Sequence, residues 1–151
     1  MKSGSLKHGH ERTFVLMFEK GDEVVRELEH FAKKNRIAGA QLSAMGAFSD
    51  VTLASFDWKT NRYKRAVEIR QQVQLVSLVG DIAQEKGQPV VHCFVVVAKQ
   101  DGAVFGGHLV QAHVRPGLEV ILMEASQYFQ RRYDPESGLA LLRPDPNSSK
   151  S

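Results

Sequence analysis

The stretch VHCFVVVAKQDGAVFGGHLVQAHV, residues 91–114, decides how this chain folds. Two apolar runs rich in β-branched residues lie on either side of a Gln-Asp-Gly turn at residues 100–102, a pattern typical of an antiparallel hairpin. The same stretch holds three of the six histidines, His92, His108 and His113. It therefore predicts a hairpin and raises the question of whether its histidines form a binding site.

Further strands are predicted on both sides of this hairpin. Before it, strands are expected at residues 13–19, on both sides of Gly46 and over residues 73–80, with DIAQEKGQP as a loop leading into the hairpin. After it, one more strand is expected from Leu118 towards Tyr128. The short connections between these segments favour antiparallel pairing over crossover helices.

One amphipathic helix is expected from Glu23 to Asn35, because apolar residues recur there at three- and four-residue spacing. Asp22 is the expected N-cap, and Lys33 and Lys34 fall in the last turn, where they complement the helix dipole. The fold class is therefore α+β, a mainly antiparallel β-sheet with one main flanking helix.

Length and composition indicate one globular domain. A chain of 151 residues, with 42% hydrophobic and 25% charged residues, matches a soluble domain and fits neither a disordered nor a membrane protein. The polar ends are expected to be flexible, so the domain is predicted over residues 12–142, between flexible segments at 1–11 and 143–151. The N-terminus has no secretory signal and Cys93 has no partner cysteine, which together indicate the cytoplasm.

The net charge of +3 gives little guidance about partners. It would assist contact with a phosphate backbone, but many soluble proteins that bind no nucleic acid carry as much. A basic set at Lys2, Lys7 and Arg12 is the one N-terminal feature that favours DNA.

Several segments together resemble a known family. The order GAFSDVTLA (46–54), VQLVSLVG (73–80) and PVVHCFVVVAKQDGAVFGGHLVQAHVRPGLEVIL (89–122) is similar to the plants-and-prokaryotes-conserved, or PPC, domain. Residues 12–37 resemble the family's first strand and helix. The most specific part is the Asp-Gly turn followed by Gly-Gly-His at residues 106–108.

The resemblance implies a compact antiparallel sheet with flanking helices, so short helical pieces besides the main helix, and assembly as a homotrimer. It also implies a DNA-binding or regulatory role. In plants the domain follows an AT-hook of the RGRP type, and this chain has no such arm. The alternative is a protein that binds a metal or a small molecule at a histidine site near a subunit interface. An enzyme is one form that this alternative could take. No catalytic residues are predicted.

The metal alternative depends on the histidines. Family members commonly carry a His-x-His pair in this strand; His92 matches its first position, but Phe94 occupies the second. A metal would then need His108 and a third ligand such as His113 or Glu119, and three imidazoles plus water would suit zinc or another divalent transition metal. The other interpretation is that these histidines make only ordinary hydrogen bonds.

Three further features have two interpretations each. Gly106 and Gly107 mark a close approach, either of a neighbouring subunit or of a ligand. Glu119 lies within an apolar run and, if partly buried, needs a partner. Phe56 and Trp58 share a strand face and are expected in the core or at a subunit interface, and Cys93 is expected to be a buried small residue.

Overall fold

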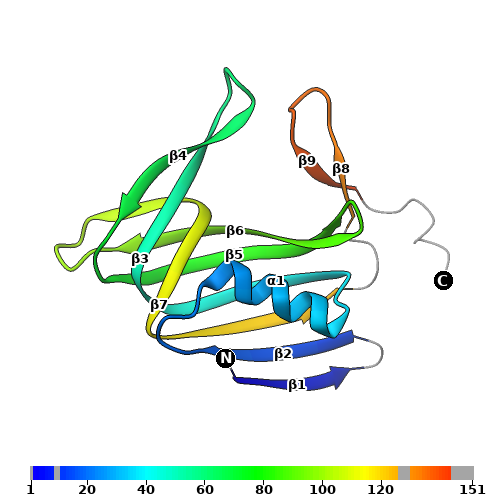
Figure 1. Ribbon diagram of the computed structural model, residues 1–151, viewed down its shortest axis with the longest axis horizontal. Coiled ribbons are helices and arrows are strands. Elements are labelled where there is room, and N and C mark those ends of the chain that lie inside the picture. Colours follow the sequence, from blue (N-terminus) through cyan, green and yellow to red (C-terminus); the bar gives the residue numbers. More distant parts are fainter. Residues whose placement is uncertain (1, 9–10, 126–129, 144–151) are drawn as a thin grey trace.

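The computed structural model describes residues 2–8, 11–125 and 130–143, which form one nine-stranded sheet and one helix (Figure 1). Helix α1 lies against the sheet, and two hairpins project from the sheet at the top of the view. The elements are β1 (Lys2–His8), β2 (Glu11–Phe18), α1 (Val24–Asn35), β3 (Gly39–Asp57), β4 (Arg62–Ile69), β5 (Val73–Glu85), β6 (Gln88–Ala98), β7 (Val104–Glu124), β8 (Gln130–Tyr133) and β9 (Ala140–Arg143).

The strand order confirms the mainly antiparallel α+β class. The path β1-β2-β7-β3-β5-β8-β9 forms the sheet, β4 pairs with β3, and β6 joins β5 to β7. Every pairing is antiparallel except the short one between β5 and β8. The expected short helical pieces do not occur within the described ranges. No described helix is long and apolar enough to cross a membrane.

The N-cap of helix α1 lies one residue later than expected. Glu23, in an extended conformation, is the N-cap, and its carboxylate accepts hydrogen bonds from the backbone N–H groups of Val25 and Arg26. Asp22 was the predicted cap, but its carboxylate accepts from the Glu19 N–H at 2.9 Å and so closes the preceding turn. The helix ends at Arg36 in the left-handed conformation, with φ of 54°.

Three strand boundaries differ from the prediction because the pairing partners continue. β3 passes through Gly46 as one strand, with an irregular register there, because β5 and β7 pair with it on both sides. β5 and β6 continue through the predicted loop and turn tightly at Lys86 and Gly87, both with positive φ. Residues 2–8, expected to be flexible, form β1 along the edge of β2.

The sheet has two faces of different character. On one face α1 contributes buried side chains to the core, where Phe31 meets Phe14 edge to face at 5.1 Å. On the other face, directly paired residues form a row across five strands: Val15, Ile121, Ser43, Val79 and Phe94. The four apolar members of this outward row are 45–56% exposed, and no described element covers them.

Candidate functional site

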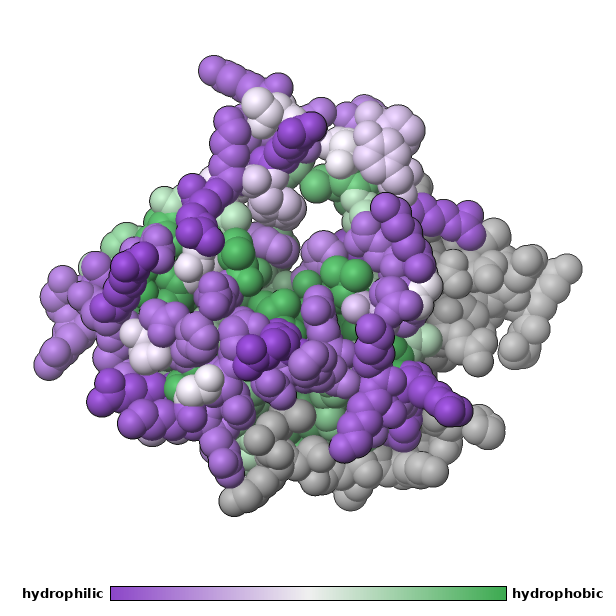
Figure 2. Space-filling view, viewed as in Figure 1, coloured by the Kyte–Doolittle hydropathy of each residue, from purple (hydrophilic) through white to green (hydrophobic). Residues whose placement is uncertain are grey.

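A cleft of about 410 Å³ opens where the β3–β4 and β8–β9 hairpins rise from the sheet. The opening between the two hairpins is visible in the space-filling view (Figure 2). Six separate segments of the chain supply its lining: Gln41, Tyr63, Val79, Gly80, Asp81, His92, Phe94, Arg131, Leu139, Ala140 and Leu141. It therefore contains two members of the outward row and one of the predicted site histidines.

Aromatic rings meet at one side of this cleft. His108 stacks on Tyr63 with ring centroids 4.5 Å apart, and Phe94 meets His108 edge to face at 5.6 Å. His92 lies 5.8 Å from His108, measured between ring centroids. The prediction that His92 and Phe94 share a face is confirmed, because both line the same cleft.

The aromatic contacts continue along the β3–β4 hairpin. Phe56 meets Tyr63 at 5.3 Å and Trp58 at 4.8 Å, both edge to face. Trp58 is 77% exposed, so of its two expected places the core of the subunit is wrong, and the subunit interface stays a prediction. The rings thus line the hairpin from near its tip down to the cleft.

Polar groups at the base of the cleft are only partly satisfied. Arg131 donates to both carboxylate oxygens of Asp81, at 2.8 and 2.7 Å, and to the Ala140 carbonyl at 2.8 Å. His92 Nε2, His108 Nδ1 and Arg131 Nε are buried without a hydrogen-bond partner among the described residues. Buried polar atoms usually have a partner, so these three are available to a bound molecule or to water.

Burial also affects how the two histidines titrate. Desolvation lowers the pKa of His92, and the positive charge of Arg131 lowers it further. The pKa of His108 is lowered mainly by desolvation, with His92 and Arg131 as smaller causes. Both imidazoles are therefore neutral at neutral pH, each with one donor and one acceptor nitrogen.

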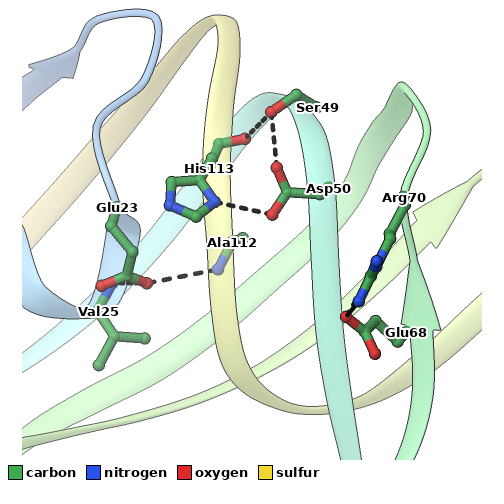
Figure 3. A network of polar contacts seen from close by, with 8 residues as sticks. All are labelled: Glu23, Val25, Ser49, Asp50, Glu68, Arg70, Ala112 and His113. Atoms are coloured by element: carbon green, nitrogen blue, oxygen red, sulfur yellow. Dashed lines mark hydrogen bonds and ion pairs between the residues drawn. The ribbon is translucent and has the colours of Figure 1, made fainter.

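His113 lies in a separate network (Figure 3). Its Nδ1 is 2.8 Å from Asp50 Oδ1, and the Ser49 hydroxyl donates to the other Asp50 oxygen. Beside it, the carboxylate of the helix cap Glu23 accepts from the Ala112 N–H at 3.4 Å. The Ser49 hydroxyl contacts the aspartate and a backbone carbonyl instead of the imidazole ring, so these residues tie β3 and β7 to α1 and do not form a nucleophile–base pair.

The residues brought together do not complete the metal site considered from the sequence. His92 and His108 converge, but His113 is bound to Asp50 and Glu119 lies on the outward face opposite Met17 and Met45. The described residues contain no group of three or more His, Cys, Asp or Glu side chains placed to hold one ion. Two imidazoles fall short of the three protein ligands usual in a catalytic zinc site.

The two glycines of the hairpin have different surroundings. A Cβ on Gly107 would lie 2.8 Å from the carbonyl oxygen of Ala54, so the close approach is made by β3 of the same chain. A Cβ on Gly106 would meet nothing nearer than 3.4 Å. Gly107 is therefore required by packing within the subunit, and neither glycine lines the cleft.

Cys93 is buried, as the sequence predicts, with 1% of its surface exposed. Desolvation raises the pKa of its thiol to about 12, so almost no reactive thiolate forms at pH 8. We expect Cys93 in the folded protein to be inert to a disulfide reagent such as DTNB, and to react completely once guanidinium unfolds the chain. Fast labelling without denaturant would contradict this burial.

The β3–β4 hairpin is a feature that reasoning from the sequence missed. Residues 57–70 contain five Lys or Arg and two Asp or Glu, a net charge of +3 that equals that of the whole chain. Lys59 and Arg62 are exposed and have no carboxylate partner among the described residues. Lys64 pairs with Asp57, and this contact is the main reason that the pKa of Asp57 is lowered to about 2.

Arg12, the one member of the N-terminal basic set whose side chain the structure describes, is occupied by other contacts. The guanidinium of Arg12 donates two hydrogen bonds of 2.6 Å to Glu124 and a third to the Asn35 carbonyl. These contacts with Glu124 raise the pKa of Arg12 and compensate its charge.

The cluster of basic and aromatic residues in the β3–β4 hairpin could have been found by counting charges in short windows of the sequence. The projection of this hairpin from the sheet could not have been found in that way.

Comparisons with known proteins agree on one family. A family model described as the Plants and Prokaryotes Conserved (PCC) domain matches residues 6–126. A structure of a PPC protein from Pyrococcus horikoshii is 28% identical, with a TM-score of 0.81, and the match covers 91% of this chain and 97% of that chain. No curated protein matches the chain closely enough to add a function.

Two other similar structures carry functional descriptions. A metal-containing protein from Archaeoglobus fulgidus is 30% identical, with a TM-score of 0.80 and coverage of 87% of this chain and 92% of that chain. A "putative DNA binding protein" from Bacteroides thetaiotaomicron is 26% identical, with a TM-score of 0.81 and coverage of 93% and 96%.

Proposed function

Since the chain belongs to the Plants and Prokaryotes Conserved domain family, we propose that it acts as a homotrimeric, cytoplasmic DNA-binding protein with a regulatory role. The observation that carries this proposal is the exposed, basic and aromatic β3–β4 hairpin. The similarity to a protein described as DNA-binding supports it.

The outward row supports the trimer. Val15 pairs with Ile121 at one end of the row and Val79 pairs with Phe94 at the other, with Ser43 between the two pairs, and the nearby Met45 is 65% exposed. Exposed apolar side chains gathered on one face mark an interaction site in soluble proteins. In a closed trimer another copy of the chain would cover the end of this face at Val15, Ile121 and Met45, as the family resemblance implies, and the end at Val79 and Phe94 would stay open to the cleft.

The hairpin supplies the two elements that a nucleic-acid surface needs. Lys59, Arg62 and Arg65 are exposed cations for the phosphate backbone, and the open ring of Trp58 is available for stacking. A trimer would present three such hairpins, which multiplies a weak single contact. In this proposal the β3–β4 hairpin is the element of the domain that contacts DNA.

A charge-matched pair of variants tests this assignment. Lys59→Gln/Arg62→Gln is expected to weaken binding to a mixed-sequence DNA duplex by about tenfold at 100 mM salt, because phosphate contacts are lost from every hairpin. Lys33→Gln/Lys34→Gln removes the same charge from the end of α1 and is expected to change the affinity less than twofold. Fluorescence anisotropy with labelled DNA measures both. Equal losses in the two variants would leave only a net-charge effect and contradict the hairpin assignment.

The second candidate function is binding of a metal or small molecule at His92 and His108. The unpartnered nitrogens of these two rings favour it, as does the similarity to a metal-containing protein. If a transition metal such as zinc binds, these two imidazoles would hold it and it would act as a Lewis acid. We expect mass spectrometry of the purified protein to find well under one zinc per subunit, because the subunit provides two ligands. One zinc per subunit, lost in His108→Ala, would favour the metal.

A further inference from the structure

We infer that the cleft between the β3–β4 and β8–β9 hairpins binds a small, planar, neutral heteroaromatic molecule between Tyr63 and the two lining leucines of the β8–β9 hairpin, Leu139 and Leu141. The inference deepens the small-molecule candidate above and does not depend on DNA binding. The volume of the cleft, about 410 Å³, lies in the range of small-ligand pockets.

The aromatic side of the cleft favours a flat ring. Tyr63 already stacks on His108 with an interplanar angle of 28°, and 38% of Tyr63 remains exposed. Phe94, directly opposite His108 in the sheet, is 52% exposed and lines the same cleft. Aromatic side chains held by neighbouring rings are rigid platforms, and they stack with planar molecules whatever substituents these carry.

The opposite side is apolar. Leu139, directly before β9, and Leu141, within it, line the cleft from the β8–β9 hairpin, whereas Tyr63 lines it from the β3–β4 hairpin. A flat molecule would therefore have apolar contacts on both of its faces. Phe94 stands where the family resemblance implies a histidine, and it fits this arrangement. A phenyl ring adds apolar surface and offers no lone pair to a metal.

The base of the cleft favours a ring that carries hydrogen-bonding groups at its edge. His92 Nε2 and Arg131 Nε are buried and unpartnered, and leaving such atoms without partners is costly. A ring nitrogen or an amide on the ligand would satisfy them. The two-oxygen contact with Asp81 already compensates the charge of Arg131, which favours a neutral molecule over a carboxylate.

Titration calorimetry on the full-length protein tests the inference with three probes. Nicotinamide and adenine are planar, neutral and carry edge donors and acceptors, whereas cyclohexanecarboxamide has the same amide as nicotinamide on a saturated ring. We expect both planar probes to bind, and cyclohexanecarboxamide to bind at least about tenfold more weakly than nicotinamide. No binding of nicotinamide, or equal binding of the two amides, would overturn the inference.

Substitutions at Tyr63 locate the site. Tyr63→Leu is expected to weaken binding of the planar probe by about tenfold. Tyr63→Phe, which keeps the ring, is expected to weaken it by less than twofold. If Tyr63→Leu does not fold, Phe94→Leu at the exposed neighbouring ring serves the same purpose, with the loss expected to be severalfold. An unchanged affinity in the leucine variant that folds would show that the probe binds elsewhere. The Lys59→Gln/Arg62→Gln variant should bind the probe normally, so failure of DNA binding and failure of this site are distinguishable.

Discussion

Gly107→Val is expected to lower the midpoint of thermal unfolding by roughly 4–12 °C, equivalent to about 2–3 kcal/mol of lost stability. Even the Cβ of an alanine at this position would lie 2.8 Å from the Ala54 carbonyl oxygen and 3.4 Å from the Leu53 Cβ. The obstacle is backbone of the neighbouring strand β3, which cannot rotate away as a side chain can. The added γ-carbons would therefore force β3 and β7 apart at the centre of the sheet.

Gly106→Val is the matched control for this prediction. Gly106 precedes Gly107 in the same strand and is exposed, and its nearest obstacle lies 3.4 Å from an added Cβ. A β-branched residue suits an exposed strand position, so we expect a midpoint close to that of the wild-type protein. Circular dichroism during heating measures both variants. An unchanged midpoint in Gly107→Val would show that β3 does not approach as closely as described.

Ile121→Asp is expected to convert the proposed trimer into monomers that remain folded. Ile121 is 49% exposed and lies directly between Val15 of β2 and Ser43 of β3 in the outward row. A carboxylate there would be solvated in a monomer but buried without a partner in the assembly, once in every interface. The free-energy cost of burying three such carboxylates exceeds the stabilisation that the apolar contacts of the row would provide.

The oligomeric state is read by size-exclusion chromatography with light scattering. We expect three times the subunit mass for the wild-type protein and the subunit mass for Ile121→Asp. Val110→Asp is the control, because Val110 is 41% exposed at the irregular part of β7 outside the row. A monomeric wild-type protein, or a trimer that tolerates Ile121→Asp, would contradict assembly through this face.

The sequence predicted the elements whose patterns are local. Residues 91–114 form the expected hairpin because alternating apolar residues and an Asp-Gly turn agree with each other. The helix was predicted within one residue of its start, and the error at its cap arose because Asp22 and Glu23 compete as acceptors and the first closes a turn. The unbroken path of β3 through Gly46 was missed because it depends on pairing with strands distant in sequence.

The candidate site was predicted only in part for the same reason. Proximity of His92 and His108 followed from the hairpin, whose register places Phe94 opposite His108. Tyr63, Asp81 and Arg131 join them because separate strands and two hairpins converge, which no spacing along the chain reveals. His113 was a reasonable ligand by residue type, but its aspartate partner comes from β3, 63 residues away.

The most direct test of the proposed function is the dissociation constant of the wild-type protein for a mixed-sequence DNA duplex, measured between about 50 and 200 mM salt. Lys59 and Arg62 of each hairpin in contact with DNA would displace about two counterions. We expect measurable binding at the lowest salt and a plot of log K against log salt with a slope of about −2 or steeper. No binding at about 50 mM salt, or binding that does not change with salt, would contradict the proposal.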